Sequence, residues 1–469
     1  MKKKTQVSDV DTSRYDFCFD EEPSDMLKSG ITPEIINEIS KEKNDPEWMQ
    51  EFRQNALKIY NEMPTADWWP SLDGLDMSEI VTYIRAKVRM KNNWEDVPED
   101  IKNTFERLGI PQAERESLSG VGAQYDSELV YHNMREEARA DGVVYMDIEG
   151  AMRDKRYEKM IRDYFMKLVP VDDHKFAALH AAVWSGGSFV YVPKGVHVEY
   201  PLQSYFRLNA MGAGQFEHTL IIVDEDAYLH FIEGCSAPKY YKASLHAGCV
   251  EIYVKKNATM RFSSIENWSK NMYNLNTKRA IVEEGGKIEW ISGSFGSHTS
   301  CLYPMSILNG KGARAEFTSI SFAGAGQNLD TGAKIIHAAP DTSSYMNTRS
   351  ISKSGGINTF RSVVKVTKKA RGSKSSVSCE SLMLDSASRS NTIPIMDVQT
   401  SFADVGHEAK IGRIGDDEIF YLTSRGLSEE EAKALIVRGF CDDVSKELPI
   451  EYAMEMNNLI SMEMEGSIG

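Results

Sequence analysis

The sequence contains no pair of cysteines separated by two residues, the spacing typical of a closed structural zinc site. Its six cysteines are instead scattered through 469 residues. We therefore expect reduced thiols in a cytoplasmic protein rather than a disulfide framework, since a large chain without an export signal stays in a reducing compartment. The cysteines are Cys18, Cys235, Cys249, Cys301, Cys379 and Cys441.

Long apolar runs and targeting signals are also lacking. No run of about 18 apolar residues occurs, so no membrane-spanning helix is expected. The N-terminal stretch MKKKTQVSDVDTSRYD carries charges but no apolar core, which argues against a secretory signal. The net charge of −15 argues against non-specific nucleic-acid binding. We expect neither a membrane nor a nucleic acid among the partners.

Motifs of several enzyme classes are missing. No G-x-x-x-x-G-K-[ST] occurs, and its nearest approaches, Gly286-Lys287 and Gly310-Lys311, lack the spacing and the hydroxyl, so this chain should not hydrolyse nucleotides. No G-x-G-x-x-G opens a helix after a strand, and no G-x-S-x-G is present. Acids in the central region are sparse and unpaired, whereas carbohydrate cleavage would need a pair.

The charge that is present divides the chain into three regions. Residues 181–415 carry a net charge of +6, residues 416–469 carry −9, and residues 1–180 carry −12. Such a change of sign indicates separate domains. In the first region we expect helices over 33–62, with an interruption at Asp45-Pro46, and also around 78–90, 98–108 and 126–168, the last interrupted at 142–150.

The central region, 181–415, has the texture of a β-structure. Short runs of β-branched and aromatic residues alternate with Gly, Asn, Asp and Pro, and no helical pattern occurs for about 230 residues. A sandwich, a barrel and a solenoid are all compatible with this pattern. A single sandwich rarely needs such length, while a solenoid can have any length because each coil contacts only its neighbours. The pattern therefore favours an irregular parallel β-helix.

The last region, 416–469, is expected to be helical. Ser428 and Glu431 match the S-x-x-E capping box that begins a helix. Two apolar stripes at helical spacing follow, formed by Ala432, Leu435, Ile436 and Phe440 and, after Pro449, by Ala453, Met456, Ile460 and Met464. These helices could pack on the β-domain, or they could form a docking surface for another protein, which the many methionines would suit.

One constellation in the β-region could carry chemistry. Cys379, in SCESLML, precedes the adjacent His407 and Glu408 by a distance in sequence that is close to one coil of a solenoid. Thiolate, imidazole and carboxylate can all bind iron. Adjacent strand residues point to opposite faces, however, so His407 and Glu408 cannot both face Cys379 unless the strand bends. A lone buried cysteine is more often simply packed.

A basic run lies just upstream of Cys379. It consists of Lys365, Lys368, Lys369, Arg371 and Lys374. Near the thiol these cations would favour thiolate, but the run could equally be a solvated turn.

Several stretches of the sequence are specific enough to indicate a family. They are YPLQSYFRLNA, GQFEHTLIIVDE, EGCSAPKY, LHAGCVEI, SCESLML, GHEAKIGRIGDDEIFYLTSRGL and IVRGFCDDVSKELPIE. With these stretches the chain closely resembles the SufB/SufD family of the SUF iron–sulfur cluster assembly system, from about residue 35 to the C-terminus. The SufB branch fits better than SufD, because the EGC and SCESLML cysteines occur together.

The resemblance implies a right-handed parallel β-helix with helical ends. It also implies a scaffold rather than an enzyme, which builds a labile nascent cluster with two or four irons and transfers it to apo-proteins. The implied partners are a SufC-type ABC ATPase on the C-terminal helices, a SufD paralogue or second SufB copy beside the β-helix, and a cysteine desulfurase or sulfur carrier that supplies persulfide. Reduced flavin in the complex is a further option.

Residue by residue, Cys379 matches the family's cluster-assembly cysteine, Glu408 its acidic partner and His407 the adjacent histidine. Cys235 matches the proposed sulfur-accepting cysteine. The positions matching the proposed internal sulfur path are Arg207, Asn209, Glu266, Trp268 and Lys278. Glu266 stands where some relatives have glutamine, and an extra carboxylate would disfavour an anionic persulfide nearby. Cys249, Cys301 and Cys441 are expected to be packing residues.

Two rival functions remain open. In the first, Cys379 and His407 act as a nucleophile–base pair of a β-helix enzyme, which requires turnover by the isolated chain. In the second, the chain is a structural SufD-like subunit without a cluster site of its own, and its cysteines are dispensable.

Overall fold

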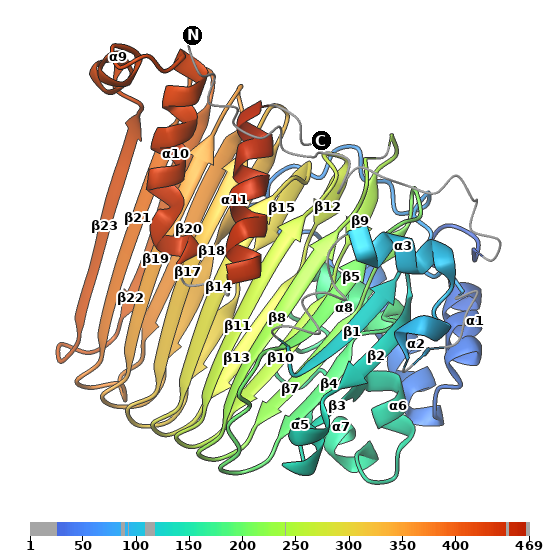
Figure 1. The fold of residues 1–469 in the computed structure, drawn as a ribbon. Coiled ribbons are helices and arrows are strands. Elements are labelled where there is room, and N and C mark those ends of the chain that lie inside the picture. The colour runs from blue at the N-terminus through green and yellow to red at the C-terminus, as the bar shows by residue number, and fades with distance from the viewer. Residues whose placement is uncertain are drawn as a thin grey trace.

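The computed structural model describes residues 26–85, 90–91, 93–107, 118–239, 241–446 and 450–465. It is mainly β, with 40% strand against 23% helix, and its centre is a parallel β-solenoid of about 8 turns (Figure 1). Helices cover the solenoid near both ends of the chain. The expected β-helix core with helical flanks is confirmed.

The first of the two sheets that form the solenoid has ten strands. They are parallel except for β1 and β2, which pair antiparallel. In spatial order they are β2 (Glu128–Met134), β1 (Gly120–Tyr125), β5 (Leu202–Arg207), β8 (Tyr228–Ser236), β11 (Thr259–Asn267), β14 (Lys287–Phe295), β17 (Arg314–Ala323), β19 (Ser343–Ser352), β21 (Lys374–Met383) and β23 (Asp404–Arg413).

The second sheet contains strands that are split in the early coils and continuous in the later ones. Five strands follow one path: β3 (Val144–Asp147), which pairs antiparallel with β4 (Ser188–Val192), then β7 (His218–Val223), β10 (Cys249–Val254) and β13 (Thr277–Val282). The path continues through β16 (Met305–Leu308) to the long β18 (Asn328–His337), which also pairs with β15 (Thr299–Leu302). Beyond β15 lie β12 (Met272–Asn274), β9 (Ser244–His246) and β6 (Gly214–Gln215), and beyond β18 lie β20 (Ile357–Val366) and β22 (Arg389–Val398).

Successive coils have nearly the same length, with matching residues in register along the first sheet. The turn that leads back to this sheet carries a residue in the left-handed region in each of six coils. These residues are Asp226, Asn257, Gly285, Gly312, Asp341 and Gly372. Asp, Asn and Gly tolerate that conformation best, which explains the turn-residue punctuation of the sequence. Asn257 also donates from Nδ2 to Asp226 Oδ1 of the preceding coil at 3.0 Å.

Apolar side chains fill the space between the two sheets at one level of the strands. Phe231, Phe262, Trp290, Phe317, Met346 and Val377 occupy one register column. Phe231 and Phe262 stack with ring centroids 5.8 Å apart, and Phe262 and Trp290 meet at 5.3 Å. One side chain from each coil thus builds a continuous apolar stack along the solenoid axis.

Most of the N-terminal helices cover the outer face of the second sheet, far from β23 (Figure 1). The interruption between α1 and α2 and the helix near 98–108 are confirmed. The expectation of helix over 126–168 is wrong in part, because β2 lies there, whereas β3 falls within the interruption expected at 142–150. Residues 78–85 form no helix, and 86–89 of that expected helix lie outside the described residues. The helices are α1 (Pro33–Lys43), α2 (Glu47–Glu62), the 3₁₀ turn η2 (Trp94–Asp96), α3 (Glu99–Arg107), α5 (Glu136–Ala140), α6 (Ile148–Arg153), α7 (Glu158–Tyr164) and α8 (Lys175–Val183). The exceptions to the placement on the second sheet are α3, whose Ile101 packs with β1 and β2 of the first sheet, and α5, whose Ala138 belongs to the interior apolar cluster.

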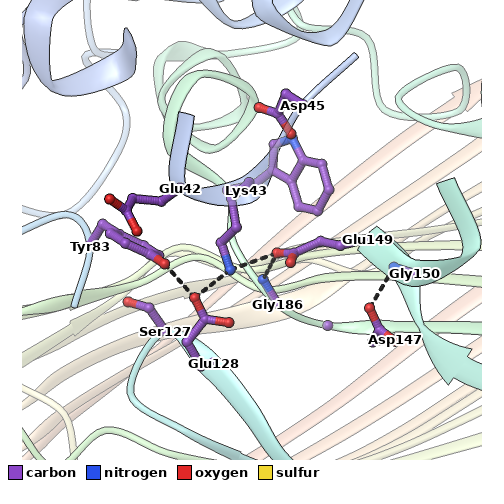
Figure 2. A network of polar contacts seen from close by, with 12 residues as sticks. Glu42, Lys43, Asp45, Tyr83, Ser127, Glu128, Asp147, Glu149, Gly150 and Gly186 are labelled. Carbon is purple, nitrogen blue, oxygen red and sulfur yellow. Dashed lines mark hydrogen bonds and ion pairs between the residues drawn. The ribbon is translucent and has the colours of Figure 1, made fainter. Parts of the chain in front are cut away.

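A buried ion cluster ties the N-terminal helices to the β-structure (Figure 2). Lys43, the last residue of α1, places Nζ 2.7 Å from Glu128 Oε1 and 2.9 Å from Glu149 Oε1. Tyr83 donates its hydroxyl to Glu128, and the Gly186 N–H donates to Glu149 at 2.8 Å. Burial raises the pKa of Glu128. Because removing one partner would leave a buried charge uncompensated, this cluster fixes α1 against β2 and α6.

Two C-terminal helices, α10 (Glu429–Ser445) and α11 (Ile450–Glu465), lie over the outer face of the first sheet (Figure 1). The shorter α9 (Asp416–Thr423) buries none of its residues and lies beyond the end of β23. The Ser428–Glu431 capping box is confirmed, and so is the stripe of α11, in which Met456, Ile460 and Met464 are buried. The stripe of α10 is wrong at Leu435, which is 50% exposed. Pro449 lies outside the described residues.

The α10 helix buries a neighbouring face instead. Val437, Cys441 and Val444 pack there together with Ala432.

The solenoid ends in two unpaired edges, β22 and β23, at the left of Figure 1. Met396, Val398 and Ile411 are between 42% and 49% exposed. Strand alternation nevertheless places them on the inward face, since Met396 and Val398 share it with Thr392, and Ile411 shares it with His407. The interior of the solenoid is therefore open at its last coil.

Candidate functional site

Cys379 and His407 meet inside the solenoid, one coil from its open end. Their strands, β21 and β23, pair in parallel, with Val377 opposite His407. The Cys379 Sγ lies 3.5 Å from His407 Nε2 and 3.7 Å from Thr392 Oγ1. His407 Nδ1 lies 3.4 Å from Ser362 Oγ. The proximity expected from the one-coil spacing is present, and His407 continues the column of Phe231 and Val377.

Burial controls the protonation of this pair. It raises the pKa of the Cys379 thiol, an effect that Thr392 opposes and Glu380 reinforces. It also lowers the pKa of His407. At neutral pH a neutral thiol thus lies beside a neutral imidazole. The thiol must lose its proton before both residues can bind a metal.

Glu408 does not join this pair. Its side chain is 67% exposed and forms an ion pair with Lys410 at 3.3 Å on the outer face of β23. Strand alternation explains the separation, since Glu408 is in register with Ser378 rather than with Cys379. Glu408 is nevertheless on the edge strand, where an incoming chain would meet it.

The basic run upstream of Cys379 does not act on its thiol. Lys368, Lys369 and Arg371 lie in the exposed turn between β20 and β21. Arg371 stacks over the Phe402 ring at 3.8 Å. The solvated-turn interpretation therefore describes this segment.

Cys235 lies in a second interior cluster, near the start of the solenoid. Its strand neighbour in register is Glu266, and Glu233 is two residues before it. Lys278 projects from the opposite sheet, with Nζ 2.5 Å from Glu233 Oε1 and 3.2 Å from Glu266 Oε1. Asn274 Nδ2 donates to Glu266 Oε2 at 2.5 Å. A buried cation held by two carboxylates thus lies beside a thiol.

The electrostatics of this cluster oppose a free thiolate. Burial, and after it Glu233 and Glu266, raise the pKa of Cys235 well above its usual value. Burial would also raise the pKa of Glu266, but Lys278 and His246 lower it, and the net direction is down. The extra carboxylate at 266 therefore acts against negative charge on the sulfur.

The other residues matched to the sulfur path divide between two places. Trp268 is buried in the same apolar cluster as Cys235, with its ring 4.5 Å from that of His246. Arg207 follows Phe206, which is in register with Cys235, so Arg207 lies on the other face of the sheet and donates to Ser236 Oγ at 3.1 Å. The backbone N–H of Asn209 donates to Asp126 at 2.6 Å.

A row of small hydroxyl side chains connects the levels of the two cysteines, which the sequence reasoning missed. Ser264, Ser292, Ser319 and Thr348 are in one register column, with Glu233 at one end and Cys379 at the other. We call this row the hydroxyl column. With strands about 4.8 Å apart, its five steps span about 24 Å. The sequence signal was a hydroxyl recurring once in each coil.

Two cavities lie near the start of the hydroxyl column. An internal cavity of about 20 Å³, enough for one water molecule, touches Ser264, Ser292 and Lys278. A surface pocket of about 550 Å³ on the second sheet also reaches Lys278. Both are lined by Asn276 and Tyr303 beside the breaks in the split strands. The breaks thus bring the surface close to the interior cluster.

Comparison with family models matches residues 206–440 to the SufBD core domain of SUF system FeS cluster assembly and residues 36–204 to the SufBD protein N-terminal region. The chain belongs to the SufB/SufD family.

Relatives support the same assignment over the whole length. The chain is 49% identical, over 98% of its length and 99% of the relative's, to the iron-sulfur cluster assembly protein SufB of Bacillus subtilis. It is 48% identical to an iron-sulfur cluster assembly SufBD family protein of Staphylococcus aureus strain MRSA252, over 100% of both chains. The expected SufB resemblance is confirmed, and the chain is linked to iron–sulfur cluster assembly by the SUF system.

The Cys379–His407 pair of this SufB/SufD family member offers fewer ligands than a stable cluster usually has. Stable clusters usually have four thiolates, whereas Cys379 and His407 supply one sulfur and one nitrogen. The five cysteines in the described part of the chain are free and buried, and Cys18 lies outside it. In the part of the chain that the structure describes, no helix has the length and apolar character needed to cross a membrane.

Proposed function

We propose that this chain is the scaffold on which the SUF system builds a nascent iron–sulfur cluster, with two or four irons, and from which apo-proteins receive it. The observation that carries the proposal is the Cys379–His407 pair, with Sγ and Nε2 3.5 Å apart at the open end of the solenoid. Two ligands from this chain hold a cluster incompletely, so the remaining ligands come from a partner, whose movement can release the cluster.

Sulfur enters at Cys235. The terminal sulfur of a donor persulfide, from a cysteine desulfurase or its carrier, transfers to the Cys235 thiol, which leaves the donor as a thiol and Cys235 as a persulfide. Converting that sulfur to sulfide needs two electrons, which reduced flavin in the complex would supply. Lys278 lowers the pKa of Cys235, against the larger opposing effects of burial, Glu233 and Glu266, so a persulfide here is held mainly in its protonated form.

The hydroxyl column is the route between the two cysteines. Its small side chains leave the interior polar at the level of Cys379 while apolar rings fill the adjacent column. Hydroxyls donate hydrogen bonds to anionic sulfur without adding charge. The surface pocket that reaches Lys278 would admit the sulfur donor at the opposite end of the route.

Partners occupy two separate surfaces. The unpaired β22 and β23 edges receive a SufD paralogue or a second copy of the chain, since open edges and exposed apolar residues favour strand addition. A groove of about 480 Å³ on the outer side of α10 and α11, lined by Leu435 and Arg438, receives the SufC-type ATPase. The C-terminal helices would then do both things considered for them, because one face packs on the solenoid and the other binds a partner.

The decisive experiment is anaerobic reconstitution with iron and sulfide in the presence of the ATPase and paralogue partners. Cys379→Ala should lower transferable cluster at least about 10-fold, read from Mössbauer and visible spectra and from activation of an apo-protein. Cys301→Ala is the matched control, because Cys301 is also buried but lies on the second sheet among packing residues. Equal cluster in wild type and folded Cys379→Ala would refute the site.

Sulfur entry is tested separately. With a desulfurase and cysteine as the sulfur source, Cys235→Ser should lose cluster formation, whereas with inorganic sulfide it should retain it. Loss under both conditions would show that Cys235 is needed for folding or ligation and not for sulfur acceptance.

A second candidate is an enzyme in which His407 activates Cys379, and the 3.5 Å contact favours it. The raised pKa of Cys379 counts against an activated nucleophile. Covalent labelling of Cys379 by small electrophiles, faster than that of free cysteine and dependent on His407, would support this candidate over the scaffold.

A further inference from the structure

A second group of metal-binding side chains lies outside the proposed cluster site, on the outer face of the second sheet. His180 on α8, His218 on β7 and Cys249 on β10 are all buried. One donor atom from each residue lies within 4.8 Å of the others. His218 and Cys249 are directly opposite in register, and α8 brings His180 onto them.

Hydrogen bonding determines the tautomer of His180. Its Nδ1 lies 2.9 Å from the carbonyl oxygen of Ala247, which can only accept, so Nδ1 carries the proton. In a neutral ring protonated at Nδ1, Nε2 carries a lone pair, and this Nε2 lies 3.0 Å from His218 Nδ1.

The other nitrogen of His218 faces a carboxylate. Its Nε2 lies 3.3 Å from Glu251 Oε2. Glu251 accepts the backbone N–H groups of Met166, Leu168 and Val169 at 2.6 to 2.8 Å. The favourable arrangement therefore places a proton on His218 Nε2. A neutral His218 then has its own lone pair on Nδ1, and two lone pairs face each other across 3.0 Å.

Without a cation between the rings, each way of placing the protons on two neutral imidazoles leaves an unfavourable contact. A proton on His218 Nδ1 would satisfy His180, but it would leave the His218 Nε2 lone pair 3.3 Å from an anionic oxygen. A metal ion between the two nitrogens removes the conflict. Tetrahedral ligands with bonds of about 2.0 Å lie about 3.3 Å apart, close to the observed separation.

Two sulfur atoms complete the donor set. The Cys249 Sγ lies 4.0 Å from the Met166 Sδ. Met166 has φ of 50°, a left-handed conformation that is uncommon for a residue other than glycine. In this conformation the Met166 N–H donates to Glu251, and the Met166 thioether lies near Cys249.

We propose that His180, His218 and Cys249 bind one thiophilic metal ion with a filled d shell, Zn²⁺ or Cu⁺, with Met166 as a weak fourth ligand. Imidazole, thiolate and thioether donors select such ions. The second nitrogen of each histidine lies near an oxygen, as in metal-bound histidines: His180 Nδ1 hydrogen-bonds a carbonyl, and His218 Nε2 lies 3.3 Å from the Glu251 carboxylate without forming a hydrogen bond to it. The ion replaces the proton of the Cys249 thiol, so each binding event releases one proton.

This site is independent of the proposed cluster scaffold. Cys249, His218 and Glu251 point to the outer face of the second sheet, whereas Lys278 points into the solenoid. The ion would join α8 to β7 and β10, and its binding energy would stabilise the N-terminal helices on the solenoid. The ion has a structural role. Cluster assembly by a folded chain does not depend on redox chemistry of this ion.

The test uses the full chain carrying Cys379→Ala, so that the Cys379–His407 pair does not bind the probe. Reduced, chelator-treated protein is titrated anaerobically with Co²⁺, and then with Zn²⁺ or Cu⁺ in competition. We expect one Co²⁺ per chain, with tetrahedral visible bands and a thiolate-to-cobalt charge-transfer band that Zn²⁺ or Cu⁺ removes. The stronger competitor identifies the ion that the site prefers.

Matched variants locate the binding. Cys249→Ser should abolish the charge-transfer band, while Cys301→Ser, a buried cysteine of the same apolar cluster, should keep it. Glu251→Gln should keep the band and weaken Co²⁺ binding about 10- to 100-fold, as loss of an outer partner does. A band that survives in Cys249→Ser would overturn the proposal.

A measurement on the wild-type chain tests the site even if the variants misfold. X-ray absorption of the wild-type chain with one equivalent of Zn²⁺ should give two nitrogen and one or two sulfur neighbours, with one proton released at pH 7. Absence of stoichiometric binding would show that the two imidazoles share a proton instead, and would overturn the metal site.

Discussion

His407 and Glu408 are adjacent in the chain but face opposite sides of β23, and this difference separates their roles. His407 contacts Cys379 in the interior, whereas Glu408 pairs with Lys410 at the surface. Of the two residues, only His407 is thus placed to bind a metal together with Cys379 of the same chain. Glu408 can reach a cluster only if a partner chain carries that cluster to the outer edge of β23.

We expect His407, and not Glu408, to be a cluster ligand. In clusters reconstituted with histidine-labelled protein, reduced samples should show nitrogen hyperfine coupling that His407→Ala removes. Glu408→Gln should retain the coupling, because its side chain lies on the other face. Loss of the cluster in Glu408→Gln with retention in His407→Ala would reverse the assignment.

Single residues were predictable from sequence where the coil period fixes them. The one-coil spacing of Cys379 and His407 was enough to place them together. Strand alternation showed that His407 and Glu408 could not both face Cys379, but the register that selects His407 was not predictable. The hydroxyl column was not recognised, because isolated serines resemble ordinary strand or turn residues until exact register aligns them. His180 could not be placed either, since only the packing of α8 on the second sheet brings it to His218 and Cys249.

Among the helices, α11 holds an unusual buried acid. Burial raises the pKa of Glu463 to about 7, although Lys270, Lys353 and Lys239 lower it. The Glu463 Oε1 atom has no hydrogen-bond partner among the described residues. A carboxyl group that is more basic when folded binds its proton more tightly in the folded state, so its stabilising effect is present at low pH and is lost as pH rises through about 7.

We therefore expect α11 to loosen between pH 5 and pH 8, by about 3 kcal/mol in its local opening free energy. Hydrogen exchange of α11 peptides, corrected for the intrinsic pH dependence, measures this change. Glu463→Gln should remove most of it, and the exposed Glu430→Gln on α10 should leave it intact. An equal slope in all three proteins would contradict the assignment to Glu463.

Element types were predictable where patterns are long. The α1–α2 interruption, the capping box of α10 and the many short strands follow from local signals. The helix expected over 126–168 is wrong in part because β2 pairs with β1, which in turn pairs with β5 of the solenoid, and local sequence does not reveal this pairing. Leu435 was assigned to the wrong face because α10 packs through Val437 and Cys441. The division at 180/181 and 415/416 remains a prediction.

At the scale of the whole molecule, the solenoid is closed at one end and open at the other. Strands β1 to β3 and the N-terminal helices cover the first coils, while β22 and β23 have unpaired edges with half-exposed Met396 and Ile411. Half-exposed apolar residues beside a free sheet edge mark an interface or an aggregation hazard. We propose that a paralogue or a second copy covers this end.

Lysine at both positions tests that interface. Met396→Lys with Ile411→Lys should weaken association with the paralogue, or self-association, by at least about 100-fold, because a buried unpaired ammonium costs several kcal/mol. Analytical ultracentrifugation measures the change, with Leu435→Lys on the far side of α10 as the control. Unchanged association in the double variant would place the partner elsewhere.

The repeating coil also sets the distance between the two sulfur sites. The levels of Cys235 and Cys379 are separated by a fixed number of coils, and each coil contributes one strand to the first sheet. That distance can change only in whole steps of about 4.8 Å, by gain or loss of an entire coil. A shorter insertion would shift the register and turn inward residues outward. Sequence drift can thus alter the residues along the route while its length stays fixed.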